Sequence, residues 1–229
     1  MKTSEKTKKQ GLEDTSSITN ILIADDHSII RNGLVNLFLL SHMVPNSKID
    51  EAIDGDSAYE KIKNNNYQLV ILDVQMPETD TFSLVENILR IKPHTNILMF
   101  SMTREDMYAK RFLQLGAKGF INKEASTEEI KKAILTVLGN ERYLSQRLKD
   151  ELTEVALGKK SGNPFENLTT REFEIFQHLV QGETLSRISE ILHIHSSTLG
   201  THKKNILEKS NCKNILELTL LARVNNIIP

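Results

Sequence analysis

The sequence predicts an α/β fold, with a doubly wound five-stranded parallel sheet, followed by a small all-α domain that contains a helix-turn-helix. Three observations support this prediction. Short apolar runs alternate five times with segments in which apolar residues recur every three or four positions. The alternation then stops, and a stretch rich in Gly, Lys and Ser follows at residues 158–162. The rest of the chain has only helical periodicity, which indicates a separate helical domain.

Five strands are expected in the first part of the chain, at residues 20–25, 48–53, 68–73, 95–101 and 118–122. The segment after the first strand carries Ile29, Leu34 and Phe38 at helical spacing. Strands and helices in alternation are typical of a parallel sheet with helices on both faces. Ser126 and Glu129 have the spacing of a capping box, which predicts the start of the fifth helix.

The second part should begin with a helix over residues 171–180, capped by Thr169 and ended by Gly182. The helix-turn-helix is expected next, followed by a last helix over 214–224. Its parts are a helix over 184–192, a tight turn at 193–195 and a helix over 198–209 capped by Ser196 or Ser197. The chain thus divides into a disordered leader (1–19), an α/β domain (20–142), a linker (143–164) and the helical domain (165–229).

Composition excludes several classes of protein. The net charge is -1, 39% of the residues are hydrophobic, and Cys212 is the only cysteine, so a disulfide scaffold is excluded. No apolar run is long enough to span a bilayer, and no apolar region follows the basic start. We therefore expect a soluble cytoplasmic protein. Residues 165–229 carry no net charge, so any contact with nucleic acid depends on a local basic patch.

Polar side chains with complementary chemistry are predicted at the carboxyl ends of the strands, where open parallel sheets bind ligands. Asp25 and Asp26 follow the first strand, and Asp73 ends the third. Three clustered carboxylates repel one another unless a cation is present, and oxygen ligands suit Mg²⁺. Ser101 ends the fourth strand and Lys123 follows the fifth. A carboxylate nucleophile, Mg²⁺, a hydroxyl and an ammonium are what phosphoryl transfer requires.

These residues belong to motifs that resemble a known family. The sequence resembles the receiver domain of bacterial two-component response regulators, which is flavodoxin-like, at Asp25-Asp26-His27, Leu72-Asp73-Val74-Gln75-Met76-Pro77, Ser101 and Gly116-Ala117-Lys118-Gly119-Phe120-Ile121-Asn122-Lys123. It resembles the LuxR-type helix-turn-helix at Leu168-Thr169-Thr170-Arg171-Glu172 and Thr201-His202-Lys203-Lys204-Asn205-Ile206. Residues 20–227 together resemble a NarL/FixJ-type response regulator.

The resemblance implies that Asp73 accepts a phosphoryl group from a sensor histidine kinase. It implies that Asp26, Asp73 and the backbone carbonyl of Gln75 ligate Mg²⁺, with Asp25 acting mainly through water. Lys123 would pair with the phosphoryl oxygens. The phosphoryl group adds about -1.5 to -2 charge and three acceptors, which ordered donors meet in one conformation.

Two further residues would report the phosphorylated state. By resemblance, Ser101 swings inward to the phosphoryl group and Phe120 follows into the space that it leaves. Simple core packing is the other interpretation of Phe120. Thr81 stands where the family usually has Gly, and it is awkward there if the loop requires a positive φ.

The resemblance also implies that phosphorylation controls dimerisation and sequence-specific binding to two DNA half-sites. The outward face of the predicted recognition helix carries side chains that can contact phosphates and base edges: Thr198, Thr201, Lys203, Lys204, Asn205 and Lys209. Three parts of this domain depart from the family: Gly200 replaces a long polar side chain, Arg187 replaces a usual Glu, and Ser210-Asn211-Cys212 replaces a Leu-Gly-Val-like end.

Three alternatives remain open at this stage. The helix-turn-helix can bind a partner protein instead of DNA, or it can bind DNA independently of phosphorylation. A metal-dependent phosphatase would need an acid two residues after its nucleophile, where this chain has Gln75. We therefore expect no enzyme activity beyond Mg²⁺-dependent self-phosphorylation and self-dephosphorylation. His193 and His195 lack the third and fourth ligands of a stable metal site.

Overall fold

The computed structural model describes residues 18–156, 164–225, 227 and 228. The first part of the chain forms a five-stranded parallel sheet. Its strands lie in the order β2-β1-β3-β4-β5. Their bounds are β1 (Thr19–Ala24), β2 (Ser47–Ala52), β3 (Leu69–Leu72), β4 (Asn96–Ser101) and β5 (Gly119–Asn122). This is the strand order of a flavodoxin-like doubly wound sheet, so the predicted fold class is confirmed.

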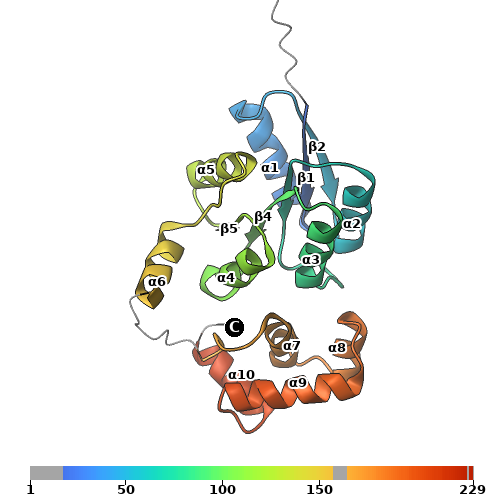
Figure 1. Cartoon of the computed structure of the whole chain (residues 1–229), viewed down its shortest axis with the longest axis vertical. Coiled ribbons are helices and arrows are strands. Elements are labelled where there is room, and N and C mark those ends of the chain that lie inside the picture. The colour runs from blue at the N-terminus through green and yellow to red at the C-terminus, as the bar shows by residue number, and fades with distance from the viewer. Residues whose placement is uncertain (1–17, 157–163, 226, 229) are drawn as a thin grey trace, which may run out of the picture.

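Four helices connect the strands, a fifth follows β5, and together they cover both faces of the sheet (Figure 1). They are α1 (Ser28–Ser41), α2 (Gly55–Asn64), α3 (Thr81–Ile91), α4 (Glu105–Leu115) and α5 (Thr127–Leu138). Side chains alternate between the faces along each strand. Ile21 and Ile23 of β1 pack in one cluster with α1 and α5, whereas Leu22 and Ala24 pack in the cluster that includes α2, α3 and α4.

The second part is helical. Helix α6 (Gln146–Ala156) follows the sheet domain, and α7 (Thr170–Val180), α8 (Leu185–Ile191), α9 (Ser196–Lys209) and α10 (Ile215–Val224) form the C-terminal domain. Residues 1–17 of the expected leader and residues 157–163 of the expected linker lie outside the described residues.

The helix ends agree with the expected capping residues at most positions. Thr169 forms a complete capping box with Glu172, and Gly182 adopts a left-handed conformation with φ of 85°. The predicted start of α9 was wrong: the helix begins at Ser196, and its N-cap is His195, whose side chain makes no capping hydrogen bond. The chain turns earlier than expected because His193 is left-handed (φ 49°), which lets the amide of Ile194 donate to the carbonyl of Ser189.

One apolar core crosses the domain boundary. The cluster beneath α3 and α4 continues into the C-terminal domain through Phe165, Phe173 and Phe176. The rings of Tyr108 on α4 and Phe173 on α7 meet edge to face, with their centroids 5.2 Å apart. The C-terminal domain therefore packs on α4 through apolar contacts as well as polar ones.

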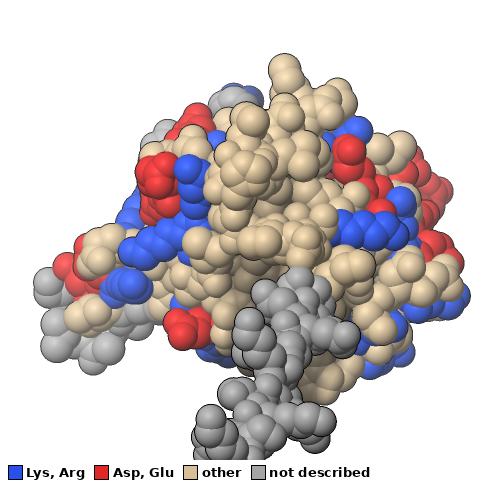
Figure 2. All heavy atoms as spheres, turned by 90° about the horizontal axis from the view of Figure 1, so that it is seen from above, with Lys and Arg blue, Asp and Glu red and all other residues tan. Residues whose placement is uncertain are grey.

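Figure 2 shows, from above, the end of the molecule that lies away from the C-terminal domain. On this face, Lys and Arg side chains lie close to Asp and Glu side chains on both flanks, and uncharged surface lies between them. This end therefore presents no excess of one sign over its visible part. Within the part of the chain that the structure describes, no helix combines the length and apolar character needed to cross a membrane.

Candidate functional site

The predicted acidic cluster forms at the carboxyl ends of β1 and β3, which are neighbours in the sheet. Asp25 and Asp26 directly follow β1, and Asp73 directly follows β3, where its amide donates to the carbonyl of Ala24 at 2.9 Å. One possible ligand atom from each of these carboxylates and from His27 lies within 4.8 Å of the others. The strand register therefore brings together residues that are far apart in sequence.

Lys123 lies at the centre of this cluster. It follows β5, and its Nζ lies 2.7 Å from Asp25 Oδ2 and 2.8 Å from Asp73 Oδ2. The side chain is only 4% exposed. Burial alone would lower the pKa of Lys123, but its hydrogen bonds and ion pairs with Asp25 and Asp73 outweigh burial, so its pKa is raised. The ammonium is therefore held in its charged form.

The carboxyl group of Asp73 is in a less favourable environment. Burial raises its pKa; the charge of Asp25 adds to this shift, whereas Lys123 and the backbone amide of Gln75 oppose it. Because the net shift is upward, the ionised form of Asp73 lacks sufficient compensating charge. A cation at this position would supply it.

The cluster fits Mg²⁺ by its donor set. Asp25, Asp26 and Asp73 bring three carboxylates against one ammonium, and hard oxygen ligands are those that Mg²⁺ prefers. Oδ1 of Asp73 is buried and accepts no well-formed hydrogen bond, although the amide of Gln75 approaches this carboxylate. That oxygen is therefore not held by a well-formed hydrogen bond within the described residues.

Ser101 and Phe120 lie near the cluster in buried positions. Ser101 ends β4, is 1% exposed, and its Oγ accepts a hydrogen bond from the amide of Thr103 at 3.3 Å. The ring of Phe120 is fully buried and stacks on Phe112, which in turn stacks on Phe82 at 4.3 Å. In this conformation Phe120 is a core residue of the face that carries α3 and α4.

The loop after Asp73 does not need glycine at the position of Thr81. Thr81 is the first residue of α3, is 4% exposed, and its hydroxyl donates to the carbonyl of Val74 at 2.7 Å. The left-handed residue of this loop is instead Glu78, with φ of 53°. The substitution at Thr81 thus adds a hydrogen bond inside the loop and causes no backbone strain.

The second candidate site is the outer face of α9. Leu199 and Ile206 are fully buried, as expected for its inward face. The predicted contact residues differ in exposure: Thr198, Thr201, Lys204 and Lys209 are exposed, whereas Lys203 and Asn205 are half-buried. An added Cβ at Gly200 would meet no atom within 4 Å, so this position lies in open space.

Lys209 is paired with a residue of another helix, whereas Lys204 pairs within α9, with Glu208 at 3.7 Å. The Nζ of Lys209 lies 2.6 Å from Oε2 of Glu172, the capping-box residue of α7. Burial alone would raise the pKa of Glu172, but hydrogen bonds from Lys209 and Thr169 outweigh burial and lower it. Lys209 therefore joins α9 to α7, and any contact with DNA would compete with this ion pair.

Sequence reasoning missed the contacts between the two domains. Arg111 on α4 is 7% exposed, and its Nη2 donates to the carbonyls of Phe165 and Leu168, both at 3.0 Å. Its guanidinium also lies 4.2 Å from the centre of the Phe173 ring. Further ion pairs join the loop after β3 to α7 and α8. Of the residues in these pairs, Arg187 stands out in the sequence because it replaces a usual Glu.

The fold, an acidic cluster bridged by lysine and a helix-turn-helix define a signalling protein with a receiver and a nucleic-acid-binding domain. Family comparison matches residues 21–135 to the response regulator receiver domain and residues 166–222 to the bacterial regulatory proteins of the luxR family. The chain belongs to the two-component response regulators with a LuxR-type DNA-binding domain.

Individual relatives and solved structures agree with this assignment. The chain is 31% identical to the oxygen regulatory protein NreC of Staphylococcus epidermidis, over 88% of this chain and 95% of that protein. It is 29% identical to the response regulator GacA of Pseudomonas protegens, over 88% and 94%. RcsB of Salmonella enterica serovar Typhimurium, solved with promoter rprA and a phosphomimetic, is 21% identical with a TM-score of 0.71, over 90% of this chain and 98% of that one.

Proposed function

We propose that this response regulator accepts a phosphoryl group on Asp73 and that this modification controls DNA binding. The observation that carries the proposal is the geometry around Asp73. Its Oδ2 is held by Lys123 at 2.8 Å, and its Oδ1 is buried without a well-formed hydrogen bond. One oxygen is thus oriented by a cation, and the other is available as a nucleophile.

The proposed reaction is an in-line displacement. Oδ1 of Asp73 attacks the phosphorus of a phosphohistidine or an acyl phosphate, an O–P bond forms, and the donor leaves with the electron pair of the bond that breaks. Asp25, Asp26, Asp73 and the Gln75 carbonyl would hold Mg²⁺, which would offset the negative charge of the phosphoryl oxygens. Lys123 orients Asp73 before transfer and donates to a phosphoryl oxygen afterwards, and Ser101 supplies a hydroxyl. Hydrolysis of the same bond by water returns Asp73 to its free form.

Phosphoryl uptake tests the assignment of Asp73. The full chain is incubated with Mg²⁺ and a labelled acyl phosphate such as acetyl phosphate, and incorporation is measured. Asp73→Asn should abolish incorporation, because an amide is not a nucleophile at this oxygen. Asp56→Asn is the matched control, since Asp56 is an exposed acid in the first turn of α2. Unchanged incorporation by Asp73→Asn would reject the assignment.

The output that we propose is binding to two DNA half-sites by a homodimer in the bacterial cytoplasm, controlled by a sensor histidine kinase. Thr198, Thr201 and Lys204 are exposed on α9, where a recognition helix can reach base edges and phosphates. Because the C-terminal domain has no net charge, we expect its nonspecific binding to be weak and strongly dependent on salt.

Selection from a random duplex library tests this output, with Mg²⁺ present and with or without beryllofluoride as a phosphoryl mimic. A paired half-site that is enriched only with the mimic supports phosphorylation-dependent binding. Enrichment in both conditions means that DNA binding is independent of phosphorylation.

A second candidate function is docking of a partner protein by the same domain. The open space around Gly200 favours it, because this position lacks the side chain that a base-reading helix would use. Lys203 and Lys204 argue against it. The absence of enrichment in both conditions of the selection would favour this candidate.

A further inference from the structure

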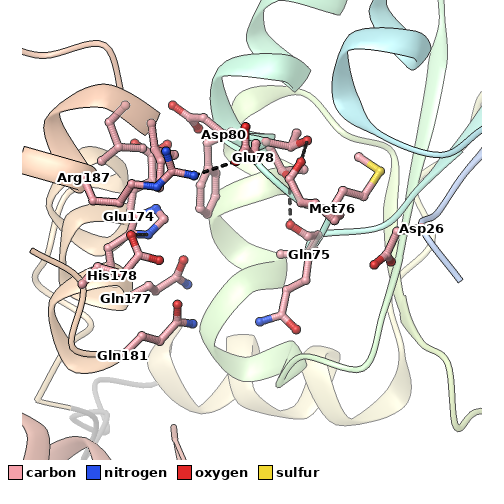
Figure 3. A pocket seen from close by; sticks show the side chains of 18 residues that line it. Asp26, Gln75, Met76, Glu78, Asp80, Glu174, Gln177, His178, Gln181 and Arg187 are labelled. Carbon is pink, nitrogen blue, oxygen red and sulfur yellow. Dashed lines mark hydrogen bonds and ion pairs between the residues drawn. The ribbon is translucent and has the colours of Figure 1, made fainter.

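The loop that follows Asp73 contacts the C-terminal domain through two ion pairs. Arg171 Nη1 on α7 lies 2.9 Å from Asp80 Oδ2, and Arg187 Nη2 on α8 lies 2.7 Å from Glu78 Oε1. Figure 3 shows the side chains of α7 and α8 facing those of the loop. The groove between them has a volume of about 370 Å³. The docked arrangement of the two domains thus depends on acidic groups from one and arginines from the other.

Arg171 is shared by two carboxylates. The same Nη1 atom lies 2.6 Å from Oε2 of Glu174 and 2.9 Å from Oδ2 of Asp80. Glu174 is 5% exposed and the side chain of Asp80 is 11% exposed. Arg171 also donates to the carbonyl of Leu192. A buried and a partly buried acid therefore meet across the domain boundary with one arginine between them, and Asp80 also accepts two hydrogen bonds from Ser83. The two carboxylates and Arg171 together carry one net negative charge.

We propose that docking of the C-terminal domain onto the receiver places one proton on Glu174, so that rising pH releases the domain. The net negative charge of Glu174, Asp80 and Arg171 gives the physical reason, because a proton on Glu174 makes this cluster neutral. Burial raises the pKa of Glu174 to about 8, and the charge of Asp80 adds to this shift while Arg171 opposes it. When the domains separate, Asp80 moves away and water reaches Glu174, so its pKa returns toward the ordinary value of 4.5.

The sign of the pH dependence follows from these two states. Below pH 4.5, Glu174 is protonated whether the domains are docked or separate, and docking is strongest. Between pH 4.5 and about 8, docking must take up a proton, and each pH unit weakens it by up to tenfold. Above about 8 the weakening levels off. The proposal concerns the free response regulator and holds whether or not Asp73 can be phosphorylated.

Other charged groups face Glu174 from the elements packed around it. They are Glu78 and Asp80 of the receiver loop, Arg171 and His178 of α7, Glu183 of the following turn and Arg187 of α8. The hydrogen bond and charge of Glu78 raise the pKa of Arg187, which stays charged throughout this range. Histidine can change its charge near neutral pH, and Nδ1 of His178 lies 3.1 Å from Glu183, so His178 needs its own control.

Energy transfer between two dyes measures docking directly. Cysteines replace Asn64 on α2 and Ser197 on α9, both of which are exposed, in a Cys212→Ser background. We expect the docked fraction to fall from pH 6 to 8 and then level off. Glu174→Gln, which imitates the protonated side chain, should stay docked throughout this range. His178→Gln should keep the pH dependence of the parent protein.

A second variant keeps the test decisive if Glu174→Gln fails to fold. Asp80→Asn leaves one acid with Arg171, and Asn can still cap α3, so docking should lose its dependence on pH. Docking that is constant from pH 6 to 9 in the parent protein would overturn the proposal. So would an unchanged slope in Glu174→Gln, or a slope that disappears in His178→Gln.

Discussion

Asp73 combines two properties that oppose each other. It is the residue with the geometry of a nucleophile, and it is also a buried carboxyl group whose pKa is raised mainly by desolvation. A carboxyl group with a raised pKa in the folded state destabilises the fold as pH increases, because the folded protein binds more protons than the unfolded chain. Burial of Asp73 therefore lowers the stability of the fold at neutral pH while it places a reactive oxygen in the site.

This cost predicts the effect of Asp73→Asn on stability. In the presence of a chelator at pH 8, the variant should raise the free energy of unfolding, on the order of 1 kcal/mol. The gain should disappear at acid pH, where Asp73 is protonated in the parent protein. Urea unfolding at several pH values measures it, with Asp56→Asn as the exposed control. A loss of stability at pH 8 would mean that the ion pair with Lys123 outweighs desolvation.

At the scale of elements, two glycines in the C-terminal domain show how backbone conformation, rather than available space, determines the effect of adding a side chain on stability. An added Cβ would meet no atom within 4 Å at either Gly182 or Gly200. Gly200 lies inside α9, where glycine weakens a helix, whereas Gly182 follows α7 with φ of 85°. The two positions thus differ in backbone conformation alone.

Alanine at these two positions should therefore have opposite effects. Gly200→Ala should stabilise the domain by about 1 kcal/mol, because alanine favours the helical conformation. Gly182→Ala should destabilise it by about 1 to 2 kcal/mol, because a left-handed conformation is unfavourable for a residue with a Cβ. Thermal unfolding of both variants measures the difference. Equal effects of the same sign would show that backbone conformation does not decide the result.

At the scale of the whole molecule, the two domains share their packing. Arg111 is the main polar contact from α4, because it donates to two carbonyls of the C-terminal domain and lies over the ring of Phe173. By contrast, Lys110 and Glu166 form a half-buried ion pair at 3.1 Å, which water can still reach. A buried arginine with charged hydrogen bonds contributes more to stability than such a pair.

Replacing Arg111 should weaken the association between the domains. Arg111→Ala should reduce the stability of the docked C-terminal domain by about 2 kcal/mol, the usual contribution of hydrogen bonds to a charged group. Lys110→Ala, its neighbour on α4, should cost less than about 1 kcal/mol. Calorimetry should show the unfolding of the C-terminal domain moving to lower temperature in Arg111→Ala only. An equal effect of both variants would contradict the assigned role of Arg111.

The sequence is sufficient to predict the sheet, the helix-turn-helix and the residues of the acidic cluster, because strand ends follow from apolar periodicity. The juxtaposition of Asp25, Asp73 and Lys123 then follows from the parallel topology. The pairing of Lys209 with Glu172 depends on the angle between α9 and α7, which periodicity does not contain. The contact of Asp80 with Arg171 depends on how two domains pack, and it leaves no local pattern in the sequence.

The continuous core restricts how this chain can evolve by exchange of domains. Here Tyr108 of the receiver packs against Phe173 of the C-terminal domain, and Arg111 covers the same ring. A chimaera that keeps only one half would expose these groups to water. Recombination that preserves this packing would therefore exchange α4 and α7 together. Substitutions on the two helices should covary.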